Sequence, residues 1–179
     1  MSLFFSTLLV GAILFFSGLA LLSKHSIVTS LLKGFPRSTT ATTLLFGAAS
    51  LWFLYNVWHL SAADFGEYRK LLFCIFSLVA VLSFIYVPDF LAVRGLAALI
   101  LLAAGPILAS AYMHYELPQR LPLVGVTFLL ICLSLWLGAQ PYRLRDFIEW
   151  LLRGQSRSRF LGACTAAYGL LLIGLSFTY

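Results

Sequence analysis

Long apolar runs alternate with short polar segments along the whole chain. Six of these runs hold roughly eighteen to twenty-one residues each, and a helix of that length crosses a hydrocarbon core of roughly 30 Å. The runs cover residues 3–22, 41–60, 71–88, 95–115, 122–140 and 160–177. The pattern predicts an all-α membrane protein with six transmembrane helices, in which residues 1–179 form a single integral membrane domain.

The first run differs from a cleaved signal peptide. No basic residue precedes it, its apolar stretch is longer than a signal-peptide core, and no Ala-x-Ala site follows it. We therefore expect this run to be a retained span.

The third and fourth runs are separated only by residues 87–95. Pro88 ends a helix, Asp89 and Arg94 are unfavourable at bilayer depth, and Gly95 permits a close reversal of the chain. This segment therefore predicts a tight hairpin.

The segment between the fifth and sixth runs, residues 141–159, predicts a short amphipathic helix. Pro141 suits the first turn, Arg153 suits the last turn, and Gly154 follows where a left-handed cap is usual. Apolar residues recur at steps of three and four, with charged residues around the remaining circumference. About a dozen residues are too few to span the bilayer, so we expect this helix to lie in the interface. The loop of residues 23–40 repeats the pattern more weakly and predicts a second interfacial helix.

Lysine and arginine are distributed unevenly among the connections. Nine of the twelve Lys and Arg residues, including Lys24, lie in the first, third and fifth connections. The second and fourth connections hold the other three, which are Arg69, Lys70 and Arg120. Short loops rich in these residues stay on the cytoplasmic side. We therefore expect a bacterial inner-membrane protein with loops one, three and five inside and both termini outside. His25 would then lie at the cytoplasmic edge of the first span.

Composition supports a membrane location and limits what the positive charge means. Hydrophobic residues make up 61% of the chain and charged residues only 10%, against about 25% in soluble domains. A net charge of +6 has no soluble face here on which to bind nucleic acid, so we expect no nucleic-acid partner. We expect anionic lipid headgroups to bind the cytoplasmic cations Lys33, Arg37, Arg143, Arg145, Arg153, Arg157 and Arg159.

The order of segments suggests an internal repeat. Leu9-Val10-Gly11 in the first run matches Leu123-Val124-Gly125 in the fifth. Each of these runs is followed by a basic interfacial segment and then by a run rich in small residues. With the central hairpin, the chain would contain three helix-hairpin repeats in one orientation.

Close packing of helices in lipid depends on small residues rather than on apolar burial. The sixth run has the clearest small-residue face, the second has a cluster of small residues, and the fourth has small residues around Pro106. We expect helix packing at Gly47, Gly105, Gly162, Ala166 and Gly169. The first, third and fifth runs are rich in Leu and Phe, and we expect them to face lipid or large partner proteins.

Histidines and cysteines offer few ligands for a metal or cofactor. His59 and His114 end the second and fourth runs, so both should lie at the outer surface, where two imidazoles could ligate a haem or a pigment. Each lies in an aromatic belt typical of membrane interfaces, and this favours a role without a cofactor. Cys74, Cys132 and Cys164 are widely spaced in apolar runs, so we expect neither a disulfide nor a metal site.

Catalytic and transport motifs are equally scarce. No run carries an ionisable residue near its centre, which argues against ion-coupled carriers and proton relays. The chain contains no Gly-x-Ser-x-Gly, no His-Glu-x-x-His and no glycine-rich phosphate loop, so we expect no enzyme activity.

These observations favour a non-catalytic integral membrane protein. We expect an accessory or scaffold subunit that packs laterally against other membrane subunits or against itself. Two alternatives stay open. A small transporter or channel for a neutral or apolar solute would use Pro106 in a gating helix, and a haem- or pigment-carrying subunit would use His59 and His114.

Overall fold

The computed structural model describes residues 2–23 and 26–179. These residues form eight α-helices, four short 3-10 helices and no strand, so the all-α class is confirmed for the described part of the chain. Lys24 and His25, which we expected at the inner edge of the first span, lie outside the described residues.

Six of the helices are long and correspond to the six apolar runs. They are α1 (Leu3–Ser23), α3 (Thr39–Trp58), α4 (Arg69–Tyr86), α5 (Leu91–Ala111), α6 (Leu121–Ala139) and α8 (Gln155–Ser176). Within the described residues, five segments are long and apolar enough to cross a membrane: Leu3–Ser23, Gly66–Tyr86, Leu91–Ala111, Pro118–Ala139 and Ser156–Ser176. By length and hydropathy, the chain is a multi-pass membrane protein. The remaining long helix, α3, has 20 residues but begins with four threonines in its first five positions, which lowers its hydropathy.

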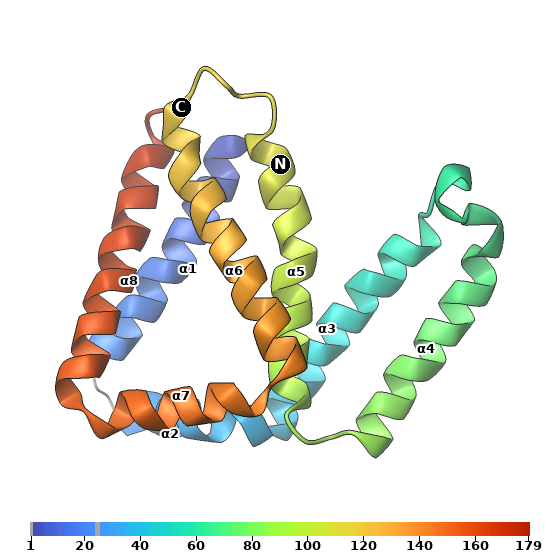
Figure 1. Ribbon diagram of the computed structural model, residues 1–179, viewed down its shortest axis with the longest axis horizontal. Coiled ribbons are helices and arrows are strands. Elements are labelled where there is room, and N and C mark those ends of the chain that lie inside the picture. The colour runs from blue at the N-terminus through green and yellow to red at the C-terminus, as the bar shows by residue number, and fades with distance from the viewer. Residues whose placement is uncertain (1, 24–25) are drawn as a thin grey trace.

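Two short helices lie across one end of the molecule. They are α2 (Ser26–Gly34) and α7 (Tyr142–Arg153), and they contact each other. Figure 1 shows both running across the lower end, while the long helices rise from them. The two predicted short helices in the first and fifth loops are therefore present. The 3-10 helices η1 (Phe35–Arg37), η2 (Ala62–Asp64), η3 (Gly66–Tyr68) and η4 (Pro118–Arg120) complete the connections.

Helix α5 stands at the centre of the arrangement. It packs against α3 on one side and α6 on the other, while α1 and α8 pack on each other as an antiparallel pair (Figure 1). The main core cluster lies where α1, α5, α6 and α8 meet, and its buried members are Leu3, Val10, Ala111, Leu123 and Leu172. Both termini lie at the end opposite α2 and α7 (Figure 1).

Polar contacts hold the ends of the helices together on the side of the termini. The Tyr168 hydroxyl on α8 donates to the carbonyl oxygen of Pro122 on α6 at 2.9 Å, and the Tyr179 hydroxyl donates to the carbonyl of Gln119 at 3.0 Å. Arg120 donates to the carbonyl of Ala111 at 2.7 Å, so a cation satisfies an orphan acceptor at the C-terminus of α5.

The α3–α4 hairpin leans away from the other helices (Figure 1). Three edge-on aromatic pairs join its two helices: Phe46 with Phe84, Phe53 with Phe76, and Trp58 with Phe73. The hairpin is therefore held together by cross-helix ring contacts along its length.

Three expectations about local structure are corrected here. Gly95 lies inside α5 rather than in the hairpin turn, because the reversal occurs at residues 87–90 with Phe90 in the left-handed region (φ 58°). Gly154 is extended (φ −120°, ψ 116°) rather than left-handed, because it ends α7 and also caps the start of α8, which leaves in a new direction. Helix α1 does not simply face lipid, because it packs closely on α8.

Candidate functional site

The closest helix contact of the chain is built from glycines on α1 and α8. Gly11 and Gly18 are seven residues apart on α1, and Gly162 and Gly169 are seven apart on α8. A Cβ added to Gly18 would lie 2.7 Å from the carbonyl oxygen of Gly162. The two backbones therefore approach each other closely at two places, where Gly18 meets Gly162 and where Gly11 meets Gly169. Small residues permit such an approach between membrane helices.

The expected packing residues occupy two kinds of position. Gly162, Ala166 and Gly169 all lie on the face of α8 that meets α1, and Ala166 is buried there. Among the described residues, an added Cβ at Gly47 or Gly105 meets no atom of another helix within 4 Å. Packing of these two glycines against a partner chain therefore stays a prediction.

Sequence reasoning missed the glycine that brings α3 and α5 together. A Cβ added to Gly95 on α5 would lie 2.7 Å from the Cα of Phe46 and 2.9 Å from the carbonyl carbon of Leu45 on α3. Gly11 and Gly18 were missed as well. Their matching spacing with Gly162 and Gly169 is the signal that could have found them.

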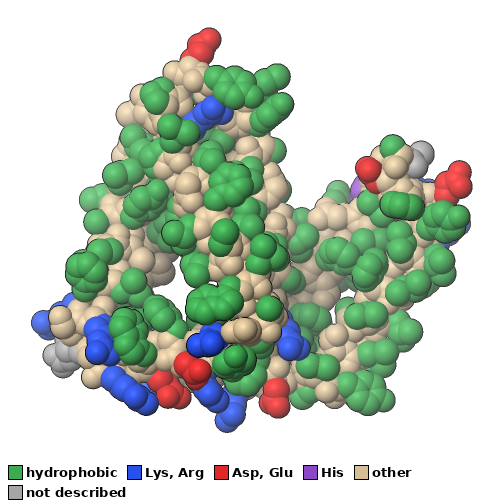
Figure 2. Space-filling model, viewed as in Figure 1, with side chains coloured by type: hydrophobic (Ala, Val, Ile, Leu, Met, Phe, Trp, Pro, Cys, Tyr) green, Lys and Arg blue, Asp and Glu red, His purple; other side chains and the backbone are tan. Residues whose placement is uncertain are grey.

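The two short helices form a basic platform, which we define as α2, η1, α7 and the first residues of α8. On α7, Ile148 and Leu151 are buried, and Ile148 lines a pocket with Leu32 and Pro36 of the first connection, while the charged residues remain exposed. Figure 2 shows Lys and Arg side chains gathered at this end of the molecule. The platform carries all seven cations that we expected to contact anionic headgroups: Lys33, Arg37, Arg143, Arg145, Arg153, Arg157 and Arg159.

Acidic partners neutralise two of the arginines on α7. Arg145 contacts the carboxylate of Asp146 at 2.8 Å, and Arg153 lies 3.8 Å from Glu149 one turn earlier. The hydrogen bond and charge of Asp146 raise the pKa of Arg145 above its ordinary value. Exposed pairs such as these contribute little stability, but they reduce the charge that the two arginines offer to a ligand.

The remaining basic residues near α8 contact other groups. The guanidinium of Arg157 lies 4.7 Å from the centre of the Trp150 ring, which is a cation–π distance. Arg159 lines a surface pocket with Leu22 and Phe160, at the corner between α1 and the start of α8. These side chains therefore extend the positive surface to the corner between α1 and the start of α8.

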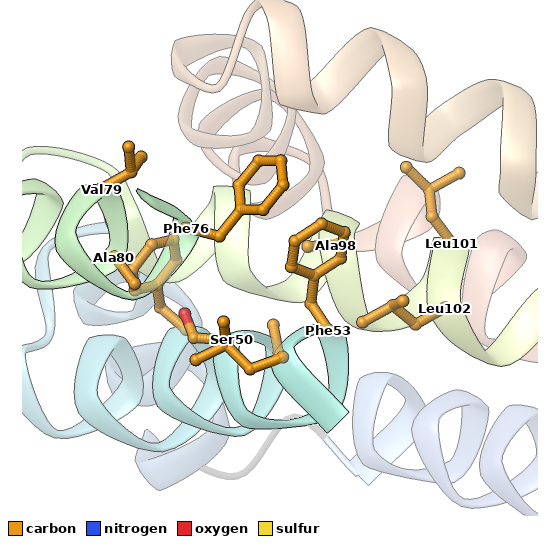
Figure 3. A pocket seen from close by; sticks show the side chains of 11 residues that line it. Ser50, Phe53, Phe76, Val79, Ala80, Ala98, Leu101 and Leu102 are labelled. Carbon is orange, nitrogen blue, oxygen red and sulfur yellow. The ribbon is translucent and has the colours of Figure 1, made fainter. Parts of the chain in front are cut away.

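An apolar groove opens between α3, α4 and α5. Its volume is about 430 Å³, and Phe53, Phe76, Ala98 and Leu101 are among the residues that line it (Figure 3). Ser50 is the one polar side chain among the lining residues. The groove exists because α4 packs on α3 while standing apart from α5. It could take an apolar helix or acyl chains, but it offers no chemistry for catalysis.

The two described histidines, His59 and His114, follow the ends of different helices. His59 caps the end of α3, where its Nδ1 lies 2.8 Å from the Tyr55 carbonyl and its ring packs on the Tyr55 ring. His114 lies in the loop after α5, and the C-terminal ends of α3 and α5 diverge in Figure 1. Within residues 2–23 and 26–179, no group of three or more His, Cys, Asp or Glu side chains could hold a metal ion.

Comparison with protein-family models, with curated proteins and with solved structures gives no match for this chain.

Proposed function

We propose that the chain crosses a bacterial inner membrane six times, with the basic platform in the cytoplasm and both termini outside. In this proposal α3 is the additional span. Its 20 residues rise about 30 Å, and it slants upward from the platform end, away from the other long helices (Figure 1). The sorting of cations supports the orientation, because nine of the twelve Lys and Arg residues lie in the odd-numbered connections or in the first turns of the helices that follow them.

Labelling of single cysteines on either side of α3 tests this sixth crossing. In a chain whose Cys74, Cys132 and Cys164 are replaced by alanine, we expect Tyr68→Cys to react with an impermeant maleimide added to intact cells. Thr40→Cys should react only after lysis. Reaction of both cysteines from the same side would show that α3 does not cross.

We also propose that the molecule acts as a non-catalytic accessory or scaffold subunit, which meets its partners laterally in the membrane. The observation that carries this proposal is the exposure of α4. None of the most apolar part of the Gly66–Tyr86 segment is buried inside the chain. Among the described helices α4 packs mainly on α3, and the apolar groove beside it provides a lateral surface for another transmembrane helix.

The experiment is purification from native membranes in mild detergent, followed by identification of co-eluting chains. Ala80→Trp would fill the groove, whereas Leu78→Trp lies on an exposed position of α4 outside it and serves as the control. We expect Ala80→Trp to lose partner chains that the Leu78→Trp variant retains. A monodisperse protein with no companion would contradict the proposal.

The proposed repeat fits the order of elements but not their contacts. In α1–α2–α3 and in α6–α7–α8, two long helices flank a short platform helix. Helix α1 packs mainly on α8, whereas α6 packs mainly on α5. We propose that the two units share an origin and that α5 now occupies the position where a symmetric partner of α6 would lie.

A further inference from the structure

Helices α6 and α7 meet at a corner that encloses an apolar pocket. The chain turns at Gln140 and Pro141, and α7 then leaves across the end of the bundle (Figure 1). The pocket in this corner has a volume of about 380 Å³. Its apolar wall consists of Leu133, Trp136 and Leu137 from α6 and Leu144 and Phe147 from α7. The volume lies within the range of pockets that hold small ligands.

The pocket opens toward the surroundings of the protein rather than into the bundle. The side chains of Leu133, Trp136 and Phe147 are 40%, 51% and 44% exposed. If α6 spans the membrane and α7 lies in the interface, this opening faces the boundary between hydrocarbon and headgroups. An acyl chain is the apolar group available at that depth.

Arg143 places a positive charge at the polar side of the same pocket. Asp146 also lines it, but the Asp146 carboxylate is paired with Arg145 at 2.8 Å. The Nε of Arg143 donates to the side-chain oxygen of Gln140 at 3.2 Å, and the guanidinium lies 5.6 Å from the centre of the Tyr142 ring. Among the described residues, Arg143 forms no ion pair, so its guanidinium keeps N–H donors for an anion.

We propose that this corner binds one anionic phospholipid, with its phosphate at Arg143 and an acyl chain against α6. The inference rests on the proposed orientation of α6 and α7 in the membrane. The apolar wall alone would accept the chain of any lipid. Phosphate oxygens accept the charge-assisted hydrogen bonds that arginine donates. The unpaired guanidinium adds selectivity for a headgroup with net negative charge, because the choline cation of phosphatidylcholine already neutralises its phosphate and is repelled by Arg143, whereas phosphatidylglycerol carries no such cation.

Trp136 provides a reporter inside the pocket. The chain has four tryptophans, and replacing Trp52, Trp58 and Trp150 by phenylalanine leaves Trp136 as the only one. This variant is reconstituted in phosphatidylcholine vesicles that contain equal mole fractions of brominated phosphatidylglycerol or brominated phosphatidylcholine. Bromine on the acyl chain quenches a nearby indole, so the quenching reports which lipid occupies the corner. We expect phosphatidylglycerol to be enriched about fivefold over its bulk fraction.

Three substitutions separate the role of Arg143 from the general positive charge. Arg143→Gln should bring the enrichment to about one, and Arg143→Lys should retain most of it. Arg153→Gln removes the same charge from the same helix, but at a residue that pairs with Glu149 and does not line the pocket, so the enrichment should persist.

Equal quenching by the two brominated lipids would overturn the proposal. An enrichment that survives Arg143→Gln, or that Arg153→Gln removes equally, would also overturn it, because the selectivity would then come from the platform as a whole. Cysteine labelling reports the orientation independently. A failure of lipid selectivity with the expected labelling would therefore count against this site alone.

Discussion

Gly11 on α1 and Gly169 on α8 face each other with their backbones in contact. A Cβ added to Gly11 would lie 3.0 Å from the carbonyl oxygen of Gly169, and a Cβ added to Gly169 would lie 2.7 Å from the carbonyl oxygen of Gly11. The relationship is reciprocal because the helices run antiparallel. This contact holds α1 and α8 together with a separation between their backbones that a residue larger than glycine would not permit.

The first prediction concerns this contact. Gly169→Ala should lower the free energy of unfolding by about 1–3 kcal/mol, because the new methyl group meets backbone atoms that cannot rotate away. Gly174→Ala is the matched control on the same helix, where an added Cβ meets nothing within 4 Å. It should leave stability unchanged or raise it by up to about 1 kcal/mol. Titration with denaturing detergent measures both, and equal effects would contradict the packing described for α1 and α8.

The second prediction concerns the contact between α3 and α5. Gly95→Ala should destabilise the protein by about 1–3 kcal/mol, because the added Cβ would meet the backbone of Phe46 and Leu45. Gly125→Ala on α6 is the control, because an added Cβ there meets nothing within 4 Å, and it should be neutral within about 1 kcal/mol. The same titration compares the two variants. An equal or larger loss for Gly125→Ala would contradict the close contact described for Gly95.

The third prediction concerns the hydrogen bond between α6 and α8. Tyr168→Phe removes the donor to the Pro122 carbonyl and should cost about 0.6 kcal/mol, the average found for side-chain hydrogen bonds between membrane helices. Tyr86→Phe is the control: it removes a hydroxyl from a side chain that is 77% exposed, and it should have no measurable effect on stability. Indistinguishable stabilities of the two variants would show that this bond contributes nothing.

The positions of the helices were largely predictable from the sequence. The periodicity of residues 141–159 placed α7 within a residue of its observed start, because a short amphipathic stretch bounded by proline and glycine has few other structures. The long apolar runs likewise marked the long helices within a few residues. At the starts of α5 and α8 the differences were larger, because Arg94, Arg157 and Arg159 were placed in connections but lie in the first turns of these helices.

The partners of each helix were much less predictable. Gly47 and Gly105 are glycines like Gly95 and Gly169, yet only Gly95 and Gly169 lie against the backbone of a neighbouring helix. Which glycine is in contact depends on how each helix is rotated and tilted, and an apolar run looks similar whether it faces lipid or another helix. The pairing of α1 with α8 joins segments far apart in the sequence, so only a comparison of distant runs, such as the seven-residue glycine spacing that both helices share, could have suggested it.

The orientation of the basic platform is tested most directly by labelling the two ends of α8. In the cysteine-free chain, Ser156→Cys lies at the platform end of α8 and Thr178→Cys lies beyond its other end, and both native side chains are exposed. An impermeant maleimide added to intact cells should label Thr178→Cys and should reach Ser156→Cys only after lysis. Labelling of Ser156→Cys in intact cells, with Thr178→Cys protected until lysis, would place the arginine-rich helices outside and contradict the account.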